Sequence, residues 1–432
     1  MELKKYKIGD LVQVTRGASL GGEFYATQGN YVRLTCGNFD YRNNCFKENQ
    51  SKDNIYYTGG FKEEFLLEKG DIITPLTEQA IGLLGSTARI PESGKYIQSQ
   101  DIAKIDCNES LLDKDFAFYL ISSACVKQQL SAAAQQTKIR HTSPDKIKEC
   151  TVWIPSLDIQ KRIGRILTDI DNKIAINRQI NDNLEAMAKQ LYDYWFVQFD
   201  FPNEDGKPYK SSGGAMVWNE KLKREIPQGW SDCVLGDYIG RITNGLNPRK
   251  NFVLGSGNNY YVTIRSLVGT TIDWNNCDRC DDEALSKINS RSQLQIGDII
   301  FSAIGTIGRT YYILEEPTNW NISETSFTLR AKENVPNDFF YGMLRSNEIQ
   351  IKADKAAMGS TLRCLIMDSL CSLQYIKIPS YMMKLFSAKV SPLYRQIHRN
   401  NKEIAELTKQ RDELLPLLMN GQASVNYHLS DD

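Results

Sequence analysis

The sequence predicts an α+β protein in which two pseudo-repeated mixed α/β domains are joined by two long helices that pack against each other. Residues 158–199 contain no proline and a single glycine, and they carry apolar side chains at heptad spacing. A second apolar seam of the same phase begins near residue 386. The segments that precede the two seams share the order of their motifs, which indicates a tandem duplication.

The first long helix is expected over residues 155–199, where asparagines interrupt the apolar seam. A polar residue on such a seam lowers stability but fixes register. Asn177 aligns with Asn400 of the second seam, so the polar break is repeated in register. The residues expected at the helix-pair interface are Ile163, Ile170, Ile174, Asn177, Leu184, Leu191, Leu393, Ile397, Asn400, Leu407 and Leu414.

The second long helix contains Pro392. Proline in a helix interior removes a backbone donor and disfavours helical geometry in the residue before it. We therefore predict that this helix kinks or restarts at Ser391, with Ser391 as its N-cap. The first helix should run unbroken from about Ile159.

The two globular segments read as short strands separated by Gly- and Asn-rich turns, which favours mixed or β-rich domains. VLGDYIGRITNGLN in the second half echoes KIGDLVQVTRGAS in the first, and each half contains a Gly-Asp-Ile-Ile quartet. The loop sequences of the two domains cannot be aligned with each other, which fits a protein whose two domains recognise different targets. The predicted boundaries are 1–154 for the first domain, 155–199 for the first helix, 200–229 for a connector, 230–379 for the second domain, and 380–432 for the second helix and tail.

Composition narrows the class of protein. The chain of 432 residues is 41% hydrophobic and 24% charged, as in ordinary soluble proteins with two or three domains. It has no apolar run of membrane-spanning length and no signal peptide at MELKKYKIGD. Ten cysteines without paired spacing suggest reduced thiols in a cytosol. Because the formal net charge is zero, any DNA binding must come from local basic patches or be shared with partners.

Motifs for catalysis are missing. An adenine methyltransferase needs a glycine-rich cofactor loop and an Asn/Asp-Pro-Pro-aromatic motif, but Asn247-Pro248 is followed by Arg249. We find no P-loop and no acid cluster suited to Mg²⁺. The glycine-spaced string SAIGTIGR is more simply a turn than a phosphate cradle. The pair Cys277 and Cys280 lacks a second ligand pair, so a loop dithiol is favoured over a metal site.

Three strings resemble a known family. FDFPNEDGKPYKSSGGAMV, then EIPQGW before a Gly-Asp turn, and LLPLLMNGQASV near the C-terminus are similar to those of the specificity (S) subunit of type I DNA restriction–modification enzymes. The resemblance extends over essentially the whole chain. It implies two target-recognition domains, each followed by a helical region, with the two long helices paired antiparallel as a coiled coil.

The same resemblance implies a cytoplasmic subunit with no catalysis and no cofactor of its own. It would bind a split site in double-stranded DNA, one half per recognition domain. Its helices would set the spacing and dock two modification (methyltransferase) subunits, which restriction (motor and nuclease) subunits then join. S-adenosylmethionine, ATP and Mg²⁺ would act on those partners.

Basic residues in loops are the candidates for DNA contact, because arginine makes bidentate contacts with phosphate or guanine. Any single one of them also fits a solvated surface charge. The set is Arg16, Arg33, Lys138, Arg140, Arg241, Arg249, Lys250, Arg265, Arg309 and Arg363. Two other functions remain open, namely a fused recognition-and-modification enzyme and a coiled-coil adaptor that binds no nucleic acid.

Overall fold

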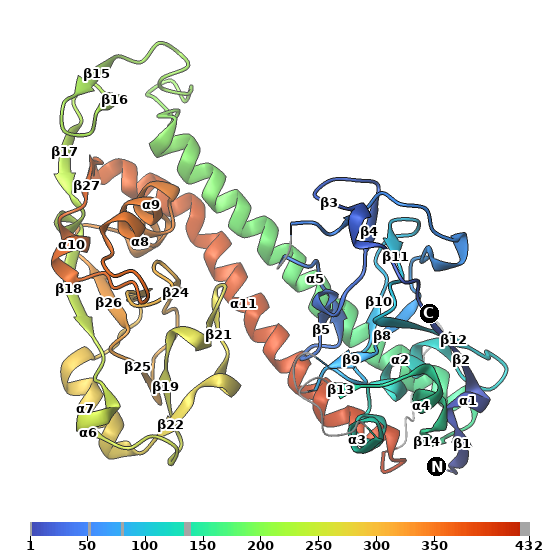
Figure 1. Ribbon diagram of the computed structural model, residues 1–432. Coiled ribbons are helices and arrows are strands. Elements are labelled where there is room, and N and C mark those ends of the chain that lie inside the picture. Colours follow the sequence, from blue (N-terminus) through green and yellow to red (C-terminus); the bar gives the residue numbers. More distant parts are fainter. Residues whose placement is uncertain (1, 51–52, 79–81, 134–139, 424–432) are drawn as a thin grey trace, which may run out of the picture. The chain divides into compact units, whose positions relative to one another are not determined.

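A computed structural model describes residues 2–50, 53–78, 82–133 and 140–423 (Figure 1). The chain divides into two compact units. Unit 1 consists of residues 1–175 and 405–432, and unit 2 consists of residues 176–404.

Unit 1 contains two four-stranded sheets. The first has the order β10-β8-β12-β2, with every neighbouring pair antiparallel. The second has the order β11-β4-β7-β3, in which β11 and β4 are parallel, and β1 pairs separately with β14. The strands are β1 (Lys4–Lys7), β2 (Val12–Arg16), β3 (Tyr25–Ala26), β4 (Tyr31–Arg33), β5 (Phe39–Asp40), β6 (Cys45–Phe46), β7 (Tyr56–Tyr57), β8 (Ile72–Pro75), β9 (Thr77–Glu78), β10 (Ala88–Arg89), β11 (Tyr96–Ile97), β12 (Ile102–Cys107), β13 (Arg140–His141) and β14 (Thr151–Ile154). The short helices are α1 (Ile8–Leu11), α2 (Lys114–Ile121), α3 (Ala124–Ala133) and α4 (Pro144–Glu149).

Unit 2 has a four-stranded antiparallel sheet of order β18-β26-β23-β24 and a three-stranded sheet of order β22-β19-β25. Strands β19 and β25 are parallel, and β17 pairs separately with β27. The strands are β15 (Met216–Asn219), β16 (Arg224–Pro227), β17 (Ser231–Val234), β18 (Ile239–Asn244), β19 (Asn259–Val262), β20 (Leu267–Val268), β21 (Thr271–Ile272), β22 (Asp278–Cys280), β23 (Ile299–Ser302), β24 (Thr310–Tyr312), β25 (Trp320–Ile322), β26 (Ser326–Ala331) and β27 (Gln374–Lys377). The short helices are α6 (Pro248–Asn251), α7 (Asp282–Ser292), α8 (Asn337–Leu344), α9 (Asn347–Ala356) and α10 (Met367–Cys371).

The Gly-Asp-Ile-Ile quartets form the turn and central strand of the main sheet in each unit. Gly70 and Gly297 have φ of +85° and +94°, a backbone conformation that glycine adopts without a Cβ penalty. The carboxylate of Asp71 accepts the backbone N–H of Glu68, and that of Asp298 accepts the N–H of Gln295. Each turn is therefore specified by its own glycine and aspartate.

The isoleucines of each quartet lie between two hydrophobic cores. Successive side chains of a strand point to opposite faces of its sheet. Ile72 packs in the core that also holds Phe116, whereas Ile73 packs in a separate core around Leu34. In unit 2, Ile299 and Ile300 likewise belong to two different cores. Both sheets are thus covered on both faces.

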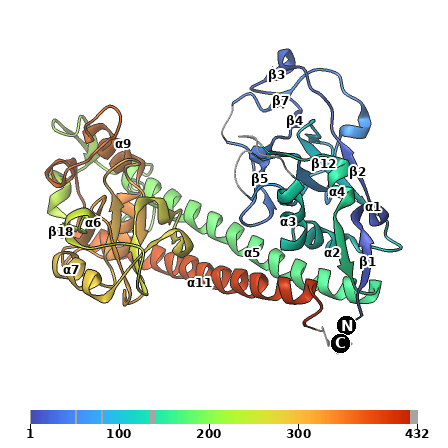
Figure 2. The same ribbon diagram turned by 60° about the horizontal axis from the view of Figure 1, so that its bottom comes forward.

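The two long helices are α5 (Leu157–Tyr192), which continues into a π-helical turn at Asp193–Val197, and α11 (Ser380–Met419). In unit 1, Ile163 and Leu167 of α5 share a core with Leu418 of α11, and α2 lies beside them (Figure 2). In unit 2, Trp195 contacts Phe386. Within each unit the stretches of α5 and α11 run in opposite directions.

All eleven residues expected on the helix-pair seam are buried or half-buried. The asparagine alignment, however, does not give the contact. Asn400 pairs with Asn181, while Asn177 donates to Glu403 at 2.9 Å. In an antiparallel pair, residue numbers rise along one helix where they fall along the other. Positions that match in the sequence alignment of the two helices therefore need not contact each other.

The predicted break at Ser391 is wrong, because α11 runs through Pro392 without interruption. Proline at this position removes one hydrogen bond to the carbonyl of Ala388. Ala388 is exposed, so its carbonyl can be solvated. Val390 and Tyr394 on either side are buried in the unit 2 core, and their packing keeps the backbone helical. The first helix begins at Leu157, close to the expected Ile159.

All ten cysteines are free thiols. Burial raises the pKa of Cys277 and of Cys280, so both are neutral thiols near neutral pH. Within the described ranges, no group of three His, Cys, Asp or Glu side chains could hold a metal ion. The same residues include no helix that is apolar over the length needed to cross a bilayer.

Candidate nucleic-acid interface

The basic residues of unit 1 differ in their exposure and in how many of their N–H donors bind other parts of the protein. Arg33 is only 6% exposed, and its Nε and Nη2 donate to the carbonyl of Asn54 at 3.3 and 3.2 Å. Its guanidinium stacks 3.7 Å from the centre of the Tyr25 ring. Arg16 is exposed and donates only its Nε, to the carbonyl of Gln100 at 2.7 Å. Arg16 is thus the more accessible of the two.

Arg140 lies on β13 next to a carboxylate. Its Nε is 3.6 Å from Glu78 Oε2, and its Nη1 donates to Ser131 Oγ at 2.9 Å. Of the five N–H donors of the guanidinium, about three are still available for another acceptor. Lys138 lies outside the described residues.

Three arginines of unit 2 bind backbone carbonyls. Arg241 donates to the carbonyl of Arg291 at 3.2 Å. Arg363 forms an ion pair with Asp354 at 3.0 Å and also donates to two carbonyls of the same turn. These two side chains brace the fold, and so does Arg309.

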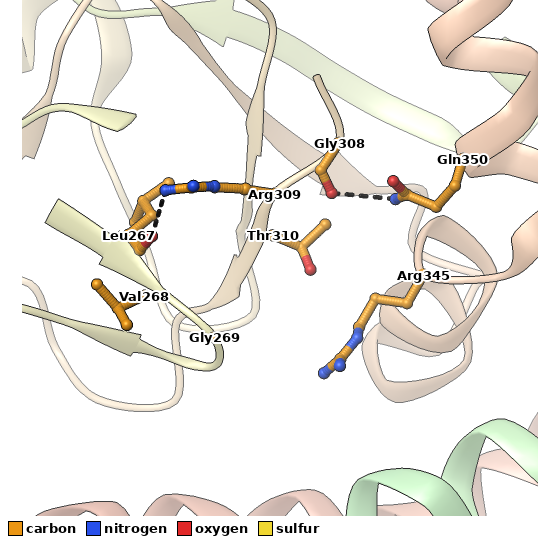
Figure 3. A pocket seen from close by; sticks show the side chains of 8 residues that line it. All are labelled: Leu267, Val268, Gly269, Gly308, Arg309, Thr310, Arg345 and Gln350. Atoms are coloured by element: carbon orange, nitrogen blue, oxygen red, sulfur yellow. Dashed lines mark hydrogen bonds between the residues drawn. The ribbon is translucent and has the colours of Figure 1, made fainter. Parts of the chain in front are cut away.

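Arg309 lines a cavity of about 390 Å³ (Figure 3). Its Nη1 donates to the carbonyls of Ile264 and Leu267 at 3.1 and 3.0 Å, which holds the hairpin of β20 and β21 in place. From the opposite wall, Arg345 reaches into the cavity. Arg345 donates to Glu185 at 2.6 Å and to the Tyr341 hydroxyl at 2.8 Å. Because both guanidiniums have partners in the protein, this cavity is not a ready anion site.

Of the candidate DNA contacts in unit 2, three have not yet been described. These are Arg249, Lys250 and Arg265, and all three are exposed. Their side chains have no hydrogen-bond or ion-pair partner among the residues the structure describes. Arg249 and Lys250 lie on α6, a single turn whose N-cap is Asn247, with Pro248 in the first helical position. Asn247 Oδ1 accepts the N–H of Arg249 at 2.9 Å, as an N-cap should. This turn presents two adjacent positive charges to solvent.

The loop that carries α6 is fastened by side chains that the sequence did not single out. Asn247 Nδ2 donates to Glu324 Oε1 at 2.8 Å, and Asn244 Nδ2 donates to the Glu324 carbonyl at 3.4 Å. The Tyr261 hydroxyl lies 2.7 Å from the Leu246 carbonyl and 2.8 Å from Glu324 Oε2. Burial, followed by the hydrogen bond to Glu324, raises the pKa of Tyr261 well above its usual value. Its neutral hydroxyl therefore remains a donor.

Sequence signals could have found part of this arrangement. Asn followed by Pro is a helix-start signature, and it marks the N-cap at Asn247. Glu324 carries no such signal, because its main partner is far away in the sequence.

The chain is similar to specificity subunits of type I restriction enzymes. Residues 1–186 match the family model described as the type I restriction modification DNA specificity domain. The chain is 26% identical over 356 residues to the type I restriction enzyme MjaIX specificity subunit of Methanocaldococcus jannaschii, covering 80% of this chain and 78% of the relative. It is 23% identical over 470 residues to the HindI specificity subunit of Haemophilus influenzae, covering 97% and 99%.

The fold is similar to a solved structure, the S subunit of a type I restriction–modification system from M. genitalium. The TM-score is 0.59 at 16% identity, and the match covers 97% of this chain and 96% of that one.

Proposed function

We propose that the chain is a specificity subunit of a type I restriction–modification system, and that it reads a two-part DNA target and performs no catalysis itself; its similarity to the DNA specificity domain and to two specificity subunits supports this. Each recognition domain, residues 1–154 and 230–379, would read one half of the target. The observation that carries the proposal is a framework present twice.

The duplicated framework is supported by strand order. In unit 1 the main sheet runs β10-β8-β12-β2, and in unit 2 it runs β24-β23-β26-β18 when read in the same sense. Each half also has a parallel pair of short strands, β4 with β11 and β19 with β25. The Gly-Asp turns at Gly70 and Gly297 stand at the same place in both sheets. A second copy with different loops suits the reading of a second, different sequence.

In each unit a cation on the neighbouring strand pairs with the turn aspartate. Lys104 on β12 lies 3.3 Å from Asp71, and Arg330 on β26 lies 2.7 Å from Asp298. The two cations stand at different positions of the register, because Lys104 lies opposite Ile73 whereas Arg330 follows Leu329, which lies opposite Ile299. The turn itself is repeated, while the cation that pairs with it differs between the two domains.

For DNA contact we propose the accessible cations, namely Arg249, Lys250 and Arg265 in unit 2 and Arg16 and Arg140 in unit 1. Lys138 stays in the set as an expectation from sequence. Arg33 and Arg363 support the loops, since two of their nitrogens bind the protein. Arg241 and Arg309 each bind backbone carbonyls through one terminal nitrogen and keep other donors, as Arg16 does, so they stay in the set of proposed contacts.

The long helices would pair as an antiparallel coiled coil, set the spacing between the two half-sites and dock the partners. The proposed partners are two modification (methyltransferase) subunits, joined by restriction (motor and nuclease) subunits in a cytoplasmic complex. A groove of about 670 Å³ on unit 2 supports the docking role, because Met187, Leu191, Tyr194 and Leu393 give it an apolar lining. S-adenosylmethionine, ATP and Mg²⁺ would be used by the partners.

The test of modular reading is a domain exchange. Residues 1–150 are replaced by the corresponding segment of another specificity subunit, and the methylated motif of the host is sequenced. One half of the motif should change while the other stays the same. If both halves change together, the two domains do not read separately.

The fused-enzyme alternative has its own test. The purified chain is incubated with DNA and radiolabelled S-adenosylmethionine. We expect no methyl transfer without modification subunits. Transfer by the chain alone would contradict the non-catalytic role. The adaptor alternative predicts no gel shift of duplex DNA even with modification subunits present.

A further inference from the structure

We infer that Glu324 is a positioning residue for DNA recognition by the second domain: its side chain sets the place of the loop that carries Arg249 and Lys250. This inference rests on the proposed function and extends it. Glu324 lies in the turn between β25 and β26 and is half-buried. Its carboxylate is not proposed to contact DNA, since it would repel phosphate. It acts through the loop residues to which it is hydrogen-bonded.

Glu324 contacts the loop at three points. Its carbonyl accepts Asn244 Nδ2 where β18 ends. Its Oε1 accepts Asn247 Nδ2, the N-cap of α6. Its Oε2 accepts the Tyr261 hydroxyl, which is equally close to the Leu246 carbonyl. The hydroxyl has one proton for two acceptors, so Tyr261 ties the carboxylate to the loop backbone.

The backbone next to these contacts is closely packed against its neighbours. A Cβ built on Gly245 would lie 1.8 Å from the Ile322 carbonyl oxygen, so the loop rests directly on β25. On the other side, the Phe252 ring packs edge-on against the Tyr261 ring, with 5.7 Å between centroids. Gly245 and Phe252 thus hold the two ends of the loop, and Glu324 holds its middle.

The same turn also fixes a second loop. The carbonyl of Thr325 accepts the N–H groups of Ala303 and Ile304, which begin the glycine-spaced segment 302–309. The Ser323 and Thr325 hydroxyls hydrogen-bond to each other at 2.6 Å. The turn at residues 323–325 is therefore hydrogen-bonded to two loops, and Glu324 is the residue whose side chain reaches the loop of α6.

The consequence is a division of roles. Arg249 and Lys250 supply charge and donors, while Glu324 and Asn247 decide where those donors stand. Hydrogen bonds that read a base tolerate little displacement. Loss of the Glu324 contact should therefore relax discrimination in the half-site read by the second domain more than it weakens binding overall.

The experiment uses the full-length chain assembled with its modification subunits. Duplexes selected from a random pool define the bound motif, and affinities are then measured for the selected duplex and for versions with either half scrambled. The variants are E324A, E324Q, N247A, N247D and R249A/K250A. The matched control is E333Q, which neutralises an exposed carboxylate of unit 2 that has no hydrogen-bond or ion-pair partner among the described residues.

E324A removes both side-chain acceptors, the one that binds Asn247 Nδ2 and the one that binds the Tyr261 hydroxyl. We expect its discrimination against the scrambled second half to fall roughly 5- to 150-fold, the range of one good bidentate base contact. E324Q should lose less, because its oxygen can accept from Asn247 while its amide donates to the Tyr261 oxygen, whose proton then goes to the Leu246 carbonyl. Discrimination against the scrambled first half should stay as in the wild type. E333Q should resemble the wild type, and R249A/K250A should lose second-half discrimination and also bind all duplexes more weakly.

A polarity exchange separates positioning from general damage. In N247D/E324Q the amide of the new glutamine donates to the new aspartate, which can still accept the Arg249 N–H as N-cap. The net charge equals that of the wild type. N247D alone sets two carboxylates against each other, so we expect it to lose second-half discrimination and the double variant to regain most of it. The thermal unfolding midpoint is recorded for every variant.

Each outcome decides. Wild-type discrimination in E324A, equal loss in both halves, or no recovery in N247D/E324Q relative to N247D would overturn the positioning role. If E324A fails to fold, N247A, N247D and the double variant carry the same comparison. An undivided motif selected by the wild type would instead overturn the proposed two-part reading. The two failures are therefore distinguishable.

Discussion

Asn400 Nδ2 donates a 2.8 Å hydrogen bond to Oδ1 of Asn181, and both side chains are buried between α5 and α11 in unit 2. Asn181 in turn donates to Asn401 Oδ1 at 2.8 Å, and Gln396 donates to Asn400 Oδ1 at 2.7 Å. A slip of one helix by a turn would leave these amides buried without partners. The pair therefore specifies register.

Asn181→Ala should lower the free energy of unfolding by about 1–3 kcal/mol, because it leaves the Asn400 amide buried and unpaired. The double variant N181L/N400L should be less destabilised than either single alanine variant, since the side chains that lose a partner, Gln396 and Asn401, are only half-buried and can bind water. Urea unfolding measures both effects. Asn183→Ala, at an exposed position of the same helix, is the control and should change stability little. A loss in N181A/N400A equal to the sum of the two single losses would mean that the pair is not coupled.

Pro392→Ala should stabilise α11. The substitution supplies an N–H for the carbonyl of Ala388 and removes an unfavourable residue from a helix interior, worth up to about 3 kcal/mol. Lys384→Ala, exposed in the same helix, is the control for alanine's helix propensity. A rise in the unfolding midpoint for P392A well beyond that of K384A is expected, and a fall would show that the ring is needed for packing.

Asp200 gives a prediction with a defined pH dependence. Its carboxylate accepts Ser211 Oγ at 2.5 Å and the Ser211 N–H at 2.7 Å, and these hydrogen bonds lower the pKa of Asp200 below its usual value. A carboxyl with a lowered folded pKa stabilises the fold above its unfolded value of about 3.9, and this contribution is lost as pH falls through the folded value.

Asp200→Asn should therefore lower the thermal unfolding midpoint at neutral pH, and the difference from the wild type should shrink below about pH 4. Thermal unfolding over a pH series measures it. Asp205→Asn, at an exposed position in the same connector, is the comparison. A difference that is constant with pH would show that Asp200 acts by shape alone.

The proposed spacing role of the helices predicts the effect of an insertion. Four residues added after Asn181 and four at its partner Asn400 should lengthen the helix pair by about 6 Å, because an α-helix rises 1.5 Å per residue. That length is nearly two base pairs of DNA. Four residues almost complete a helical turn, so the seam stays in phase to within about 40°.

The measurement is the methylome of cells that carry the insertion. Both half-sites should be unchanged, and the unspecified gap between them should grow. An unchanged gap with full activity would show that the helices dock partners without measuring DNA.

Local chemistry made part of the structure predictable. The Gly-Asp turns follow from a glycine at positive φ and an aspartate that binds its own loop, and the long helices follow from their apolar seam. Pro392 misled because buried neighbours outweigh the preference of a single residue. Asn400 was aligned by duplication, although contacts between antiparallel helices follow a different rule.

The side chains proposed to contact DNA were harder to predict. Arg33 and Arg249 look alike in the sequence, yet one stacks under a tyrosine and the other is exposed. Only the folded chain distinguishes them. Glu324 meets Asn247 across 77 residues of sequence, and no short pattern encodes such a contact.

The close approach of Gly245 to the Ile322 carbonyl also bears on how specificity can evolve. A side chain at position 245 would push the whole loop off the sheet, so that position is closed to variation. Arg249, Lys250 and Val253 lie a few residues on and are exposed, Val253 to 79%. If the second domain reads DNA through this loop, as proposed, new target preferences can arise by substitution at the tip of the loop while its base is inherited unchanged.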